Sequence, residues 1–102
     1  MADLPIACSL DAHALKARRE GLLARLVQRA SERYELPDGI QLRFTADSQI
    51  LDDIAEVVKA ERLCCRFLRF TINVQPDEGP MMLDLTGPPG TREFVAALLD
   101  QP

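Results

Sequence analysis

The chain has 102 residues, of which 47% are hydrophobic and 27% charged, values typical of one soluble globular domain spanning residues 1–102. A formal net charge of -4 argues against general binding to nucleic acid or to a membrane surface, because phosphate affinity depends on clustered Lys and Arg. The sequence contains no basic leader and no apolar run of about 20 residues, so we expect a cytoplasmic protein.

The first third of the chain predicts a strand followed by a helix. A short strand is expected at residues 4–8, and a helix from about residue 11 to residue 34. Within that helix, apolar residues recur at helical spacing: Leu15, Leu22, Leu26 and Ala30. Pro37 then ends the helix, and Asp38 and Gly39 make a turn.

The rest of the chain predicts three strands and two helices. Alternation indicates a strand at residues 40–45 and another at residues 66–74. Between them, Asp47 or Ser48 begins a helix. A further strand follows the loop "QPDEGP", the segment "TGPPG" forms a rigid turn, and the last helix covers residues 91–99.

These elements predict an α+β fold with the order β-α-β-α-β-β-α. Strands that alternate in polarity have one buried and one wet face, so three helices should cover one face of a four-stranded, mostly mixed sheet in a two-layer sandwich. In the strand at residues 66–74, Leu68, Phe70, Ile72 and Val74 are predicted to point inward. Phe67, together with Met82 of the next strand, would lie on the wet face as a possible dimer surface.

Glu61 is the most anomalous residue of the sequence. In a helix with 3.6 residues per turn, it falls close to the centre of the apolar stripe formed by Ile50, Ile54 and Val57. A carboxylate in that position is costly unless it is paired, hydrogen-bonded or protonated. Cys64 and Cys65 follow it at i+3 and i+4, the spacings at which helical side chains touch.

Three cysteines suggest a metal site. Cys8 ends the first predicted strand, and Cys64 and Cys65 end a helix, so the three thiols converge if those two ends meet. Three thiolates suit a soft ion such as Zn(II), Cu(I) or another soft metal or metalloid. Glu61 would then be a further ligand or an adjacent base, and a small molecule is the other possible ligand of such a site.

Other interpretations of the same residues stay open. Free cysteines also pack as small buried hydrophobes. Cys64 or Cys65 could instead be the nucleophile of a thiol-dependent redox or nucleophilic enzyme, with Glu61 as its proton donor or acceptor. Arg19 lies in the apolar stripe of the first helix and is the natural partner of Glu61, either at a site or in a structural salt bridge. A third alternative is a non-catalytic homodimerisation or binding domain.

Four segments carry a resemblance: "IACSL", "LPDGIQLRF", "ERLCCRFLRF" and "LDLTGPPGTREF". Together they resemble a group of small bacterial proteins with an E-x-x-C-C-P-F-x-x-F segment and a T-G-P-x-G-x-x-x-F tail, to which no activity is attached. The positions that match are Cys8, Glu61, Cys64, Cys65, Phe67, Phe70, Gly87, Pro88, Gly90 and Phe94. Arg66 stands where the motif has proline. The resemblance implies only that the glutamate and the cysteines occur together.

Overall fold

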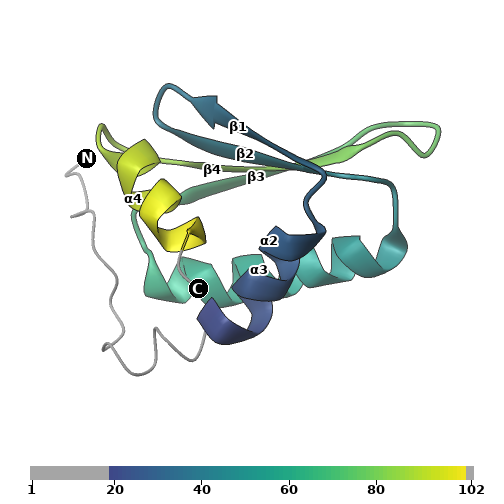
Figure 1. The fold of residues 1–102 in the computed structure, drawn as a ribbon, viewed down its shortest axis with the longest axis horizontal. Helices are drawn as coiled ribbons and strands as arrows, with labels where there is room; N and C mark the ends of the chain where they lie inside the picture. The colour runs from purple at the N-terminus through teal and green to yellow at the C-terminus, as the bar shows by residue number, and fades with distance from the viewer. Residues whose placement is uncertain (1–18, 101–102) are drawn as a thin grey trace.

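The fold is an α+β arrangement in which one antiparallel sheet carries helices on one side (Figure 1). The structure, a computed structural model, describes residues 19–100. The expected first strand at residues 4–8 lies outside that range. The four strands are β1 (Glu32–Leu36), β2 (Gly39–Phe44), β3 (Arg69–Val74) and β4 (Met81–Thr86). They lie in the order β1-β2-β4-β3, and every pairing is antiparallel, so the prediction of a mostly mixed sheet is wrong.

The helices are a π-helical segment η1 (Arg19–Leu23), α2 (Ala24–Arg29), α3 (Ser48–Cys64) and α4 (Thr91–Leu99). Figure 1 shows α2, α3 and α4 on the same side of the sheet. Over the described residues the order is therefore α-β-β-α-β-β-α. No helix among residues 19–100 is long and apolar enough to cross a bilayer.

The core forms where the sequence alternates most regularly. The inward rows of β2 and β4 are buried in one core with the inward faces of α3 and α4 and with Leu23 and Leu26 of η1 and α2. This confirms the predicted strand at residues 40–45, the helix beginning after Asp47 and the last helix at Thr91–Leu99. The core residues of these four elements are Ile40, Leu42, Phe44, Ile50, Ile54, Val57, Met81, Leu83, Leu85, Val95, Leu98 and Leu99.

The predicted helix at residues 11–34 is wrong at its C-terminal end. Helix α2 ends at Arg29, and β1 begins three residues later at Glu32. β1 then forms a hairpin with β2, with Leu36 opposite Gly39. Because β1 is an edge strand whose side chains are mostly exposed, it lacks the alternation that marks a half-buried strand.

A salt bridge attaches β1 to the C-terminal end of α4. Arg33 donates to Asp100 at 2.8 Å, and this hydrogen bond lowers the pKa of the Asp100 carboxyl. The contact joins the first described strand to the end of the last described helix. It lies in solvent, so its contribution is small.

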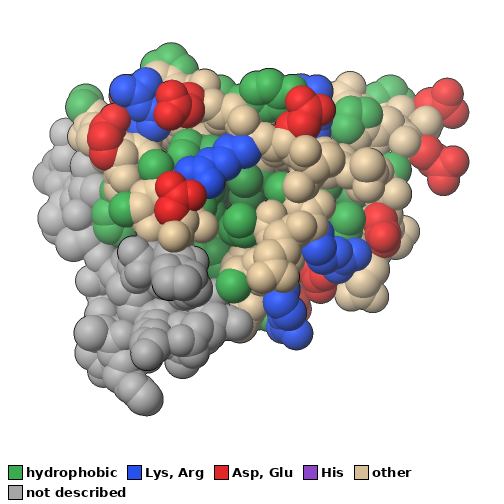
Figure 2. All heavy atoms as spheres, viewed as in Figure 1, with side chains coloured by type: hydrophobic (Ala, Val, Ile, Leu, Met, Phe, Trp, Pro, Cys, Tyr) green, Lys and Arg blue, Asp and Glu red, His purple; other side chains and the backbone are tan. Residues whose placement is uncertain are grey.

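The β3–β4 hairpin forms a protruding end of the molecule (Figure 1). Its loop holds Asp77 and Glu78 with φ angles of 59° and 57°, in the left-handed region. Figure 2 shows acidic side chains gathered at this end. At its other end, β3 begins at Arg69, shortly after Arg66. The strand therefore has basic residues at its start and the acidic residues Asp77 and Glu78 after its end.

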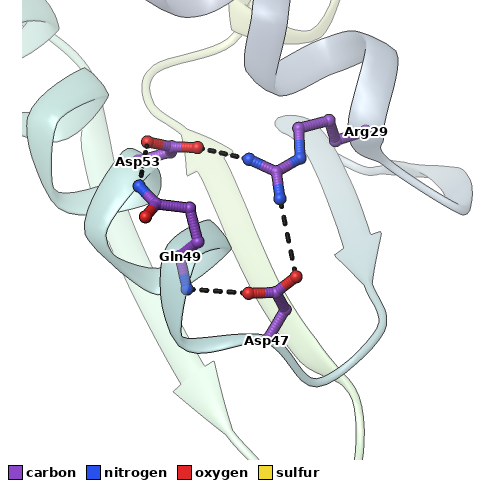
Figure 3. Close-up of polar contacts among 4 residues, drawn as sticks. All are labelled: Arg29, Asp47, Gln49 and Asp53. Carbon is purple, nitrogen blue, oxygen red and sulfur yellow. Dashed lines mark hydrogen bonds and ion pairs between the residues drawn. The ribbon is translucent and has the colours of Figure 1, made fainter.

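The start of α3 is held by a network of side chains (Figure 3). Asp47 caps the helix by accepting a 2.7 Å hydrogen bond from the backbone N–H of Gln49. Arg29, from the end of α2, bridges Asp47 at 3.6 Å and Asp53 at 2.5 Å. The network therefore joins α2 to the first turns of α3.

Replacing Asp47 by alanine should lower the free energy of unfolding by about 1 kcal/mol, because the helix loses its cap and Arg29 loses one of its carboxylates. Urea unfolding followed by circular dichroism measures this loss. The matched control is Asp52→Ala, at an exposed position of the same helix, which should change stability by less than about 0.5 kcal/mol. Equal effects of the two substitutions would contradict the capping role.

Candidate functional site

Glu61 lies on the buried face of α3, as its helical phase predicts. It follows Ile54 and Val57 on the same stripe, and only 2% of its surface is exposed. Helix α3 positions it because the apolar stripe must face the sheet, and position 61 falls on that stripe. A buried carboxylate thus stands at the end of a helix whose other inward residues are aliphatic.

Cys65 is the C-cap residue of α3 and is completely buried. Its backbone N–H donates to the Glu61 carbonyl at 2.7 Å, which continues the helical hydrogen bonding to the cap. Its Sγ lies 3.8 Å from Glu61 Oε2, with the thiol as donor and the carboxylate oxygen as acceptor. The predicted contact between the acid and the cysteine four residues later is therefore present.

The residues after Cys65 form a tight turn rather than the first part of a strand. The Leu68 N–H donates to the Cys65 carbonyl at 3.1 Å, and β3 begins only at Arg69. Phe67 is consequently buried, and its ring packs edge-on against Phe94 of α4 with ring centroids 5.0 Å apart and an interplanar angle of 82°. The prediction that Phe67 lies on the wet face is wrong, and Met82 on that face is half-buried.

The turn between β4 and α4 packs directly against this corner. A Cβ at Gly87 would stand 3.1 Å from the Phe67 carbonyl oxygen and 2.7 Å from Thr91 Oγ1, so only glycine fits here without movement. Thr91 is fully buried, and its hydroxyl donates to the Pro88 carbonyl at 2.6 Å. Gly90 has a φ of 100°, which favours glycine.

The motif residues within the described range therefore gather at one end of the sheet, where α3 ends, β3 begins, β4 ends and α4 begins (Figure 1). Glu61 and Cys65 come from the first of these junctions, and Gly87 and Phe94 from the second. Thr91 belongs to the same corner but was not singled out from the sequence. The sequence feature that could have indicated its role is a hydroxyl residue at the first position of a helix, directly after a Gly-Pro-Pro-Gly turn.

The other predicted site residues are only partly placed. Cys64 is the last residue of α3 and Arg19 the first of η1, but their side chains lie outside the described part, as does Cys8 entirely. Within the described part, no group of three or more His, Cys, Asp or Glu side chains could hold a metal ion. The convergence of three thiols, and the pairing of Glu61 with Arg19, stay predictions.

Comparisons with known proteins do not assign the chain to a family. Family models, curated proteins and solved structures were all searched, and none matches the chain. The functional argument therefore depends on the corner itself.

Proposed function

We propose that the corner around Glu61 and Cys65 is a binding site for a soft metal ion, such as Zn(II) or Cu(I), with cysteine thiolates as ligands. The observation that carries the proposal is the 3.8 Å separation of Cys65 Sγ and Glu61 Oε2. With metal–sulfur bonds near 2.3 Å and metal–oxygen bonds near 2.1 Å, a tetrahedral ion holds a sulfur and an oxygen ligand about 3.6 Å apart. One ion could bridge the pair with little movement.

The chemistry of the pair also suits metal loading. A thiol must lose its proton before it binds a metal, and the Glu61 carboxylate is within reach to accept the proton of Cys65. Burial of both side chains keeps water away and strengthens the attraction between thiolate and cation. Cys64 and Cys8 are the residues that would complete the ligand set, with Glu61 as a fourth ligand or as the adjacent base.

Thiol-dependent nucleophilic or redox catalysis is the second candidate, because a carboxylate hydrogen-bonded to a thiol is also the arrangement of a base and its nucleophile. The complete burial of Cys65 favours the metal site, since a nucleophile must reach its substrate. Alkylation by iodoacetamide separates the two functions. Rapid labelling of Cys65 below pH 7 in the metal-free protein would favour catalysis.

The metal site is tested by loading the reduced full-length protein with Zn(II) or Cu(I), removing free metal and weighing the protein by native mass spectrometry. We expect one retained ion in the wild type, none in Cys65→Ala, and an affinity at least about tenfold lower in Glu61→Gln. Glu56→Gln, an exposed acid on the same helix, is the matched control and should bind as the wild type does.

Each variant is checked for its helical signal by circular dichroism, so that loss of metal is not confused with loss of fold. A wild type that retains no ion, or a Cys65→Ala variant that retains it fully, would overturn the proposal. The Cys64→Ala and Cys8→Ala variants then show which further thiols bind the ion.

A further inference from the structure

Strand β3 is an open edge of the described sheet. It pairs with β4 on one side only, and the backbone N–H of Gln75 donates to the Pro80 carbonyl at 3.3 Å at the end of this pairing. In an antiparallel ladder, hydrogen-bonded and non-hydrogen-bonded pairs alternate. The backbone groups of Phe70, Ile72 and Val74 therefore point away from β4, toward the open edge.

The side chains of this edge are apolar and exposed. Ile72 and Val74 lie opposite the buried residues Leu83 and Met81, so they share the inward face of the sheet. The pairing agrees with the predicted inward direction, yet Ile72 is 41% and Val74 55% exposed, so the described helices leave this edge uncovered. A groove of about 250 Å³, lined in part by Leu51, Val74 and Met81, continues the apolar surface toward α3.

The two edges of the sheet differ in how they are protected. Strand β1, at the other edge, has the sequence ERYEL, whose charges discourage pairing with another strand. Strand β3 has the sequence RFTINV, with no charge and no proline after Arg69. An uncharged, exposed edge strand is a template for a further strand.

The charges at the two ends of β3 favour a second copy of the same strand. Arg66 and Arg69 stand at its beginning, and Asp77 and Glu78 in the loop after its end. All four are exposed, and the ion pairs found among residues 19–100 involve none of them. A two-fold axis across the strand places the basic end of each copy beside the acidic end of the other.

We propose that the protein forms a two-fold symmetric dimer by antiparallel pairing of β3 with β3 of a second copy. In the register centred on Ile72, each Ile72 lies opposite the other, and Phe70 lies opposite Val74. Arg69 then lies opposite Gln75 of the second copy, close to its acidic loop. The two sheets become one continuous sheet, and the exposed side chains of both edges cover one another.

The test is sedimentation equilibrium of the full-length protein over a range of concentrations. We expect a dimer for the wild type and a dimer dissociation constant at least about 100-fold higher for Ile72→Lys, because two lysines meet at the axis. Tyr34→Lys is the matched control: Tyr34 is 40% exposed on the other edge strand, and its replacement should leave association unchanged.

A charge exchange provides a second, independent test. Arg69→Glu should raise the dimer dissociation constant by roughly tenfold, and the double variant Arg69→Glu/Glu78→Lys should restore most of the loss. A monomeric wild type would overturn the proposal and leave the edge to a strand from elsewhere in the chain or from another protein. Dimerisation of Ile72→Lys as strong as that of the wild type, or a charge exchange that restores nothing, would also overturn it.

Discussion

Replacing Gly39 by alanine is expected to lower the free energy of unfolding by about 3 kcal/mol, because there is no room for a side chain at this position. An alanine Cβ would stand 2.0 Å from the Leu85 carbonyl oxygen and 2.8 Å from the Thr86 Cα, both backbone atoms of the neighbouring strand β4. Strands β2 and β4 are the two central strands, so their backbones must separate at this end of the pairing to accept one methyl group. Urea unfolding measures the loss.

The control for this substitution is Gly21→Ala, since a Cβ at Gly21 meets no atom within 4 Å. Its effect should stay below that of Gly39→Ala, because the cost at Gly21 comes from its backbone angles of φ -98° and ψ -105° and not from a clash. If Gly39→Ala were no more destabilising than Gly21→Ala, the close approach of β2 and β4 at this point would be wrong.

Replacing Phe67 by alanine is expected to lower the free energy of unfolding by about 3 kcal/mol, because a buried aromatic ring is removed. The loss should also weaken metal retention, since the ring lies two residues after Cys65 and fixes the turn against α4. Thermal and urea unfolding give the first quantity, and native mass spectrometry gives the second.

Phe67→Leu is the conservative control and should cost less, because much of the buried volume is kept. A double-mutant cycle with Phe94→Leu should show a coupling of about 1 kcal/mol for the edge-on ring pair. A loss below about 1 kcal/mol for Phe67→Ala would contradict the burial of the ring. It would agree instead with the sequence-based prediction that Phe67 lies on the solvent-exposed face of the sheet.

The elements predicted correctly are those with one buried and one exposed face. Alternation in β2 and β4 and the helical stripes of α3 and α4 reflect burial directly, which also explains why Glu61 could be placed inward from its phase alone. The contact of Glu61 with Cys65 followed from the same helical geometry.

The predictions fail where the hydrophobic pattern of the sequence does not indicate which residues are buried. β1 is exposed on both faces, so its charged residues resemble the end of a helix as much as a strand. Phe67 was assigned to a strand that begins two residues later, and this reversed the direction of its side chain. Ile72 and Val74 lie on the inward face, as their alternation predicts, but the helices among residues 19–100 do not cover the edge on which they lie.

The place of β4 in the sheet has a consequence for how the protein is made. Although β3 precedes β4 in the chain, β4 lies between β2 and β3. Of the strand pairings in the described sheet, only β1–β2 can form before β4 leaves the ribosome, and an isolated hairpin is at best marginally stable. The end of α3 meets the turn after β4 only at that stage, so the corner that holds Glu61 and Cys65 cannot form until β4 has left the ribosome.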